Sequence, residues 1–207
     1  MINEITNYLD ELYPNPRCEL NYNKDYELLI AVVLSAQTTD KRVNKVTEVL
    51  FKKYPTLEEL KNADIKDIEE IIKEIGTYRK KAVFVKEIAS YLVDNCDSRV
   101  PNNRKVLESI SGVGRKTCNV VLSNLFDEPC IAVDTHVTRV SKRLGLAFKN
   151  DNVTTIEKKL MKKLDKSRWS KTHHQLVLFG RYNCKAIKPE CKTCKLISIC
   201  KEKDKNL

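Results

Sequence analysis

The residues best suited to carry out chemistry lie in one short segment, ISGVGRKTCNVV, at residues 110–121. Two of the five glycines in the chain, Gly112 and Gly114, stand here with one residue between them. Glycine permits a positive φ and leaves the backbone N–H groups uncovered, and we expect a positive φ at Gly114. Amides in such a turn, at the start of a helix, can bind a phosphate group. Lys116 follows in the first turn of that helix, which is a suitable place for a nucleophilic amine.

Four cysteines near the C-terminus form a second candidate site. They follow the pattern C-x6-C-x2-C-x5-C within 17 residues: Cys184, Cys191, Cys194 and Cys200. Four thiolates at this spacing can hold either a [4Fe–4S] cluster or a Zn²⁺ ion, and the spacing alone leaves both open. The other four cysteines show no ligand spacing, and we expect small core or surface residues there: Cys18, Cys96, Cys118 and Cys130.

Charge is divided unevenly along the chain. Residues 1–132 carry 19 Lys and Arg against 21 Asp and Glu, whereas residues 133–207 carry 19 against 7. The basic C-terminal third predicts a polyanionic partner, most simply nucleic acid, with a solvated lysine-rich surface as the alternative. No segment reaches about 18 uninterrupted apolar residues, so we expect no membrane span. The amphipathic start, MINEITNYLDEL, does not resemble a signal peptide, and we expect a cytoplasmic protein.

Helical periodicity runs through nearly the whole chain, and no strand alternation of useful length occurs. The sequence therefore predicts an all-α protein with short connections. Helix starts are indicated by a capping box at Thr56 and Glu59, by Asp64, and by Thr154 with Glu157. Further helices should flank the two glycines of the 110–121 segment. The other predicted helices cover residues 3–13, 25–36, 40–54, 65–76, 79–95, 131–145 and 170–184.

The hairpin ISGVGRKTCNVV, the segment IAVDTHVTRV and the cysteine pattern, in this order and separation, resemble the endonuclease III family of DNA glycosylases. The stretches ELLIAVVLSAQTTDKRVNKV, GTYRKKA and HHQLVLFGRYNC are also similar, so the resemblance covers almost the whole chain. It implies a two-domain helix-hairpin-helix DNA glycosylase fold. A six-helix barrel domain would span residues 20–130, and an iron–sulfur cluster domain would combine residues 1–19 with 131–207. The resemblance also implies a [4Fe–4S] cluster, damaged double-stranded DNA as partner, and a monomeric bacterial protein.

The resemblance assigns Lys116 as the nucleophile and Asp134 as its carboxylate partner. The amine would attack C1′ of an oxidised pyrimidine nucleotide, expel the base and leave a Schiff base that permits β-elimination of the 3′ phosphate. Asp134 would stabilise the positive charge that develops on the sugar, or help to deprotonate the lysine. The alternative for Asp134 is a capping or salt-bridged aspartate. His136 would hydrogen-bond in the wall of the active site.

Access to the damaged base requires that the nucleotide leave the helix stack. By resemblance, Gln37 fills the vacated space and contacts the estranged base. Thr77 stands where the family more often carries a bulky apolar wedge, and threonine unstacks a base step less well. Gly112, Gly114 and Arg115 are expected to contact the DNA backbone.

Two other functions remain open. The related adenine-mismatch and thymine-mismatch glycosylases share the hairpin and the cluster but characteristically lack the hairpin lysine. Lys116 therefore favours the bifunctional branch, whose members are both glycosylases and AP lyases. A DNA-binding iron–sulfur protein that senses redox state would bind DNA without turnover. The presence of both Lys116 and Asp134 argues against that second function.

Overall fold

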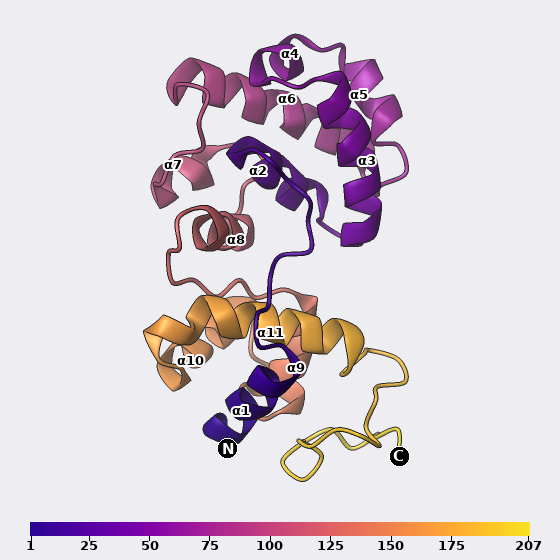
Figure 1. Ribbon diagram of the computed structural model, residues 1–207, viewed down its shortest axis with the longest axis vertical. Coiled ribbons are helices and arrows are strands. Elements are labelled where there is room, and N and C mark those ends of the chain that lie inside the picture. Colours follow the sequence, from indigo (N-terminus) through magenta and orange to yellow (C-terminus); the bar gives the residue numbers. More distant parts are fainter. The chain divides into compact units, whose positions relative to one another are not determined.

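The computed structural model describes residues 1–207, which divide into two compact units. The central unit is Glu19–Phe126, and the terminal unit combines Met1–Cys18 with Asp127–Leu207. All regular structure is helical (Figure 1), which confirms the predicted all-α class. The assignment of a six-helix barrel domain and a cluster domain stays a prediction.

The central unit is built around one apolar helix. Its helices are α2 (Asp25–Leu34), α3 (Asp40–Lys53), α4 (Leu57–Asn62), α5 (Ile65–Ile71), α6 (Tyr78–Asn95), α7 (Arg104–Ser109) and α8 (Arg115–Leu125). Nine of the ten residues of α2 are buried, and the helix packs against α3, α6 and α8. Figure 1 shows α2 with α6 on one side and α8 on the other. A helix that is apolar on all faces is stable only under such cover.

Several helix starts in the central unit follow the predicted capping chemistry. The hydroxyl of Thr56 accepts from the backbone N–H of Glu59 at 3.2 Å, and the Glu59 carboxylate accepts from the N–H of Thr56 at 2.9 Å. The carboxylate of Asp64 accepts from the N–H of Lys66 at 2.8 Å. The predicted extension of this next helix to residue 76 is wrong, because α5 ends at Ile71. The turns that follow bring two further apolar side chains, Ile72 and Ile75, into the core.

The terminal unit has its own core. Its helices are α1 (Ile2–Leu12), α9 (Thr135–Arg143), α10 (Val153–Lys163), the short 3₁₀ helix η1 (Lys166–Arg168) and α11 (Trp169–Tyr182). Helix α11 packs against α1, η1 and α9. The rings of Tyr8 and Phe179 meet edge to face, with centroids 6.1 Å apart. Leu196, within the cysteine segment, is fully buried in the same core. The cysteine segment is therefore anchored to the helices by apolar packing.

Two predicted helix starts in the terminal unit need correction. The helix expected over residues 131–145 begins only at Thr135, because residues 131–133 are buried without regular structure and Asp134 caps the helix. The helix expected to start at Thr154 is instead capped by Asn152, whose side chain accepts from the N–H of Thr155 at 2.9 Å. Asn and Asp are among the strongest N-cap residues.

The prediction that Gly145 closes α9 is confirmed, and the helix itself ends at Arg143. Gly145 has φ +70°, and its N–H donates to the carbonyl of Lys142 at 3.2 Å. The N–H of Leu146 donates to the carbonyl of Ser141 at 2.8 Å. This pair of bonds is a Schellman motif, which needs a left-handed residue after the helix.

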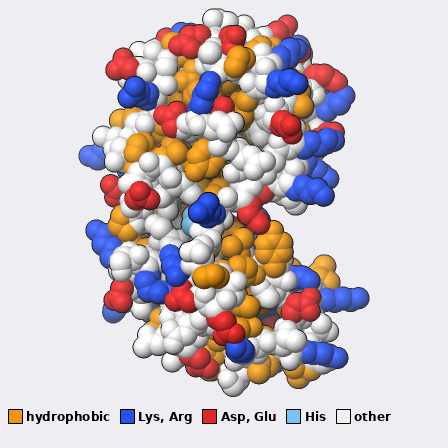
Figure 2. Space-filling view, in the orientation of Figure 1, with side chains coloured by type: hydrophobic (Ala, Val, Ile, Leu, Met, Phe, Trp, Pro, Cys, Tyr) orange, Lys and Arg blue, Asp and Glu red, His pale blue; other side chains and the backbone are white.

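The two units differ in charge. The terminal unit carries 20 Lys and Arg against 12 Asp and Glu, and the central unit 18 against 16. On the face shown in Figure 2, basic side chains are interspersed with acidic ones rather than gathered in one block. None of the helices is long and apolar enough to cross a membrane.

An acidic side chain on α1 links that helix to η1 and α11. The carboxylate of Asp10 accepts from Arg168 at 2.9 Å, from Lys171 at 2.7 Å and from Gln175 at 2.9 Å. Partial burial acts to raise the pKa of Asp10, but these hydrogen bonds outweigh it and lower the pKa to about 2.

The Asp10 cluster should make folding depend on acid pH. Since the pKa is lower in the folded chain, the carboxylate stabilises the fold above about pH 4, and this contribution is lost as pH falls towards 2. We expect Asp10→Asn to lower the free energy of unfolding at pH 7 by about 1 kcal/mol, after allowance for solvent screening. Urea unfolding followed by circular dichroism from pH 7 to pH 2 measures this difference, which should vanish at the acid end.

Glu11→Gln is the matched control, because Glu11 pairs with Lys195 in an exposed ion pair. Its effect should stay below about 0.5 kcal/mol at every pH. A stability loss in Asp10→Asn that is the same at pH 7 and pH 2 would contradict the assigned role.

Candidate functional site

The glycine segment forms a tight turn between α7 and α8. Gly112 has φ +82°, and a Cβ there would lie 2.8 Å from the ring of Phe84 on α6. Gly114 has φ −94° and is the N-cap of α8, so the expectation of a positive φ at Gly114 is wrong. The left-handed residue of the turn is Gly112, and the buried side chain of Val113 fixes the turn against the core.

The start of α8 is open to an incoming group. Its N-cap, Gly114, has no side chain to bond the first N–H groups of the helix, and a Cβ built there meets nothing within 4 Å. Unsatisfied N–H groups and the helix dipole together attract an anion. Lys116 is exposed on this first turn, and Arg115 precedes it. One helix end in the central unit thus combines open amides with an accessible amine.

Asp134 belongs to the terminal unit, where it is the N-cap of α9. Its Oδ1 accepts from the backbone N–H of Val137 at 2.8 Å, so the capping alternative for this residue is confirmed as a structural role. The cap occupies one of two carboxylate oxygens. A capping aspartate therefore keeps Oδ2 for a further partner.

Two predicted DNA-contact residues of the central unit share an unusual backbone conformation. Gln37 follows the end of α2, and Thr77 is the N-cap of α6. Both are exposed, and both have φ +55°. A positive φ is uncommon outside glycine and is most strained for a β-branched residue such as threonine. The strain marks two exposed turns of the central unit as candidate contact points.

His136 lies on α9 in a close packing contact with α11. A Cβ added at Gly180 of α11 would come within 2.9 Å of the His136 Cβ, so only glycine permits this approach. Arg139, one turn further along α9, lies 3.2 Å from Nδ1 of His136 through its guanidinium group. The same guanidinium donates to the carbonyls of Gly180 at 2.6 Å and Cys184 at 3.1 Å. The orientation of His136 is thereby tied to the first cysteine of the C-terminal segment.

Arg143 fastens the cysteine segment to α9. Its guanidinium donates to Sγ of Cys184 at 3.4 Å and to the carbonyl of Lys185 at 2.7 Å, and it pairs with Glu202 at 2.8 Å. The backbone carbonyl of Arg143 accepts from the N–H of Lys201 at 2.6 Å. Sequence reasoning missed Arg139 and Arg143. Their signal is a pair of arginines four residues apart, which by itself indicates only a basic helix face.

The four cysteines of the segment share one electrostatic environment. Burial raises the pKa of the Cys194 thiol, and the thiols of Cys184, Cys200 and Cys191 raise it further. Burial also raises the pKa of Cys184, while the guanidinium of Arg143 opposes the shift. Neighbouring cationic donors favour thiolate ligands. No three His, Cys, Asp or Glu side chains lie close enough to hold a single metal ion.

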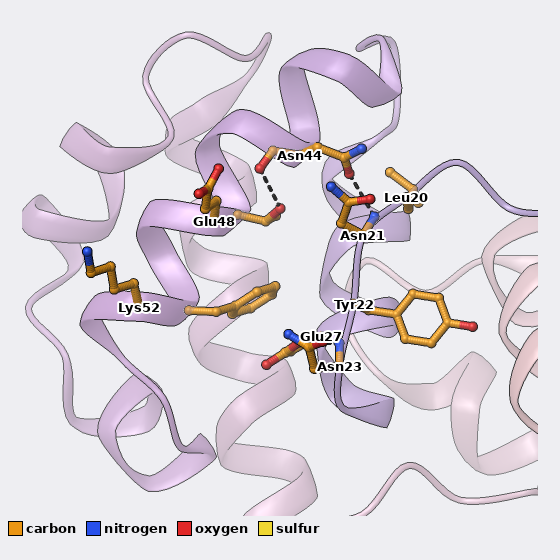
Figure 3. A pocket seen from close by; sticks show the side chains of 10 residues that line it. Leu20, Asn21, Tyr22, Asn23, Glu27, Asn44, Glu48 and Lys52 are labelled. Carbon is orange, nitrogen blue, oxygen red and sulfur yellow. Dashed lines mark hydrogen bonds between the residues drawn. The ribbon is translucent and has the colours of Figure 1, made fainter.

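One open pocket lies away from these residues. Figure 3 shows it in the central unit, with a volume of about 600 Å³, lined by residues 20–23, Glu27 and one face of α3. Asn44 on that face accepts from the N–H of Asn21 at 2.9 Å and donates to the carbonyl of Glu19 at 2.8 Å. These polar groups hold the chain before α2, and none of the predicted site residues lines the pocket.

Comparison with known proteins identifies the fold. Residues 30–166 match the model of the HhH-GPD superfamily of base excision DNA repair proteins. A solved structure of a trapped endonuclease III–DNA covalent intermediate, an estranged-adenine complex, is 47% identical with a TM-score of 0.94, covering 97% of this chain and 94% of that one. A thermostable thymine-DNA glycosylase is 25% identical with a TM-score of 0.83, covering 96% of both chains. The helices and the hairpin therefore define a helix-hairpin-helix protein of base excision repair, as predicted.

The nearer relatives narrow this class. Endonuclease III of Bacillus subtilis is 46% identical over 197 residues, which cover 95% of this chain and 90% of that protein. The chain belongs to the endonuclease III family, and it is a DNA glycosylase and AP lyase. The predicted family and enzyme class are confirmed.

The two hairpin glycines should respond differently to alanine. Gly112→Ala forces a side chain into the left-handed region and against Phe84, so we expect a loss of about 2 kcal/mol in unfolding free energy. Gly114→Ala meets open space at an ordinary φ, so its melting temperature should fall only slightly, since alanine is a poorer N-cap than glycine. If the α8 amides bind a DNA phosphate, the new Cβ should weaken binding to damaged and undamaged duplexes alike, on the order of tenfold.

Thermal unfolding and fluorescence anisotropy at one fixed salt concentration measure the two effects. Gly76→Ala serves as control, because a Cβ there also meets nothing within 4 Å. Unchanged DNA affinity in a stable Gly114→Ala would exclude the hairpin as the DNA anchor.

Proposed function

We propose that this enzyme removes oxidised pyrimidines from damaged duplex DNA and cleaves the strand 3′ to the abasic site through a Schiff base on Lys116. The observation that carries the proposal is the exposed amine of Lys116 on the first turn of α8, directly after the open glycine turn. The similar structure of a trapped covalent intermediate with DNA supports a nucleophilic route, because such an adduct needs a protein nucleophile.

The chemistry requires the neutral amine of Lys116 at C1′ of the extruded nucleotide. As the nitrogen bonds to C1′, the glycosidic bond breaks, and the base leaves with the bonding electrons and takes up a proton. The sugar ring opens to an imine between Lys116 and C1′. Loss of the C2′ proton then expels the 3′ phosphate by β-elimination, and water releases the lysine from the imine.

Asp134 is the proposed carboxylate partner of Lys116. Its Oδ1 is fixed by the N-cap bond to Val137, which limits rotation of the side chain and orients Oδ2. In this role the carboxylate stabilises the cationic sugar or accepts a proton from the amine. Capping and catalysis are compatible, since each uses a different oxygen.

We further propose that Cys184, Cys191, Cys194 and Cys200 hold a [4Fe–4S] cluster. The donation from Arg143 to the Cys184 sulfur suits thiolate ligands, and the buried side chain of Leu196 anchors the segment between the last two cysteines. When bound, such a group supplies four metal–thiolate bonds that fix the chain, and no step of the reaction passes through it. The surrounding basic residues would then face the DNA backbone.

The remaining contacts complete the proposal for a monomer bound to one duplex. Gln37 occupies the space of the extruded nucleotide and contacts the estranged base, Thr77 acts at the neighbouring base step, and Gly112, Gly114 and Arg115 bind the phosphate backbone. The estranged adenine in the similar covalent complex supports a residue with the role assigned to Gln37. His136, oriented by Arg139, lines the active site.

The cysteine segment predicts a measurable cofactor. Protein purified without oxygen should contain about four iron and four sulfide per chain, measured by colorimetric assay and visible absorption. Cys191→Ser should lose iron together with stability or DNA affinity, without a selective fall in the catalytic rate. Cys96→Ser is the control, because this half-buried cysteine lies outside the segment. One zinc and no iron in the native protein would refute the assignment.

The nucleophile is tested by borohydride trapping on duplexes that contain thymine glycol. Lys116→Gln keeps length and polarity but removes the amine, so both the trapped adduct and strand cleavage should fall to background while binding remains. Asp134→Asn should keep the N-cap, because Asn caps as well as Asp, and should slow base release by about 10²-fold or more.

Lys105→Gln on α7 is the matched control and should trap as the native enzyme does. An adduct that persists in Lys116→Gln and maps to another lysine would show that the assignment is wrong. Release of a base from a mismatched pair without any adduct would instead indicate that the enzyme acts as the mismatch glycosylases do, without a lysine nucleophile.

A further inference from the structure

Lys81 is the only buried lysine, with 3% of its surface exposed. Its ammonium group donates to the carbonyl of Ala36 at 2.7 Å and to the hydroxyl of Thr38 at 3.2 Å. Both acceptors are neutral, and burial lowers the pKa of Lys81. A buried charge without a carboxylate partner is costly, so such a residue needs a structural reason.

Part of the compensation comes from α2. Ala36 follows the C-cap of this helix, Ser35, so the ammonium lies at the negative end of the helix dipole. The carbonyl groups beyond a helix end lack partners within the helix, and Lys81 supplies a charged donor to one of them. A local polar side chain or a water molecule could also donate to such a carbonyl group. The end of α2 therefore does not by itself explain why a long cationic side chain from α6 is buried there.

The two acceptors flank Gln37. The N–H of Thr38 donates to the carbonyl of Ser35 at 3.1 Å, which closes a turn with Gln37 exposed at φ +55°. Lys81 therefore bonds to the backbone of Ala36, the residue before Gln37, and to the side chain of Thr38, the residue after it. A strained residue persists only when its surroundings hold it in place.

The other end of the link is the start of α6. The backbone N–H of Lys81 donates to the carbonyl of Thr77 at 3.1 Å, in the first turn of the helix. Thr77 is the second exposed residue of the central unit at φ +55°. A single residue thus bonds to the turn that carries Gln37 through its side chain and to Thr77 through its backbone.

We propose that Lys81 is a positioning residue that fixes the turn of Gln37 relative to Thr77. The side chains of Gln37 and Thr77 then reach the DNA in one arrangement. The proposal rests on the function proposed above for Gln37, contact with the estranged base. It predicts that loss of the ammonium group slows adduct formation most on DNA that has a base opposite the abasic site.

Lys86 provides a matched comparison on the same helix. Its ammonium also donates to the carbonyl of a helix C-cap residue, Ala63 at the end of α4, and the side chain is half-buried. No predicted DNA contact adjoins Ala63. Lys81→Met and Lys86→Met therefore remove the same kind of bond from α6, but only the first loosens the Gln37 turn.

The experiment uses two duplexes that share one abasic site. In the first, adenine stands opposite the site, and in the second the opposite strand lacks a base at that position. Single-turnover borohydride trapping gives the rate of adduct formation on each. We expect Lys81→Met to lower the rate about tenfold on the adenine duplex and about twofold or less on the other. Lys86→Met should change both rates by the same small factor.

A double variant tests whether Lys81 acts through Gln37. If it does, Lys81→Met added to Gln37→Ala should cause no further loss on the adenine duplex. Equal losses of Lys81→Met on the two duplexes, or effects that multiply in the double variant, would overturn the proposal and leave Lys81 a simple structural anchor.

Thr38→Val is the milder variant, because it removes one of the two acceptors and leaves the buried lysine with the other. Its rate of adduct formation should fall more on the adenine duplex than on the other, by a smaller factor than in Lys81→Met. Equal losses on the two duplexes would again overturn the proposal. If the native enzyme itself forms no adduct on either duplex, the function proposed for Lys116 fails too. If the native enzyme forms an adduct and Lys81→Met loses the same factor in rate on both duplexes, only the positioning role of Lys81 fails.

Discussion

Helix α2 is apolar on every face, and it can be stable only where other helices cover it completely. In the central unit α3, α6 and α8 provide that cover. The same three contacts place the candidate groups, since α8 carries Lys116, α6 begins at Thr77 and α2 itself leads into the turn of Gln37. Burial of one helix therefore determines where this unit presents its amine and its two strained turns.

The terminal unit depends in a comparable way on the close packing of α9 and α11. Gly180 allows α9 to approach so nearly that His136 lies over the glycine. The approach also brings Arg139 and Arg143 within hydrogen-bond distance of the Cys184 carbonyl. Helix α9 thus begins at the Asp134 cap and also donates two arginine hydrogen bonds to the first cysteine of the segment after α11.

Local features of the sequence predict most of the helices but not all of their ends, since α5, α9 and α10 have other bounds than expected. The capping box at Thr56, the cap at Asp64 and the glycine that ends α9 each depend on neighbours within a few residues. The backbone carbonyls to which Arg139 and Lys81 donate lie 41 to 45 residues away, and periodicity carries no information about such contacts. The positive φ expected at Gly114 is wrong because the Gly-x-Gly pattern does not say which glycine is left-handed. The left-handed one is Gly112, where a Cβ would also lie 2.8 Å from the ring of Phe84.

The residue types at the strained positions bear on function. Four other non-glycine residues also have positive φ: Asp97, Ser98, Asp127 and Lys188. Aspartate tolerates this region because its short side chain can bond to the nearby backbone. Thr77 is β-branched, and its hydroxyl donates to the carbonyl of Gly76 at 2.7 Å, whereas Gln37 is long; glycine would relieve the strain at either position. A side chain kept at such a cost, of order 1 kcal/mol or more each, is explained if the side chain itself is needed outside the fold. Both side chains are exposed and contribute nothing to the core. The strain and the exposure of Gln37 and Thr77 agree with the DNA contact proposed for them.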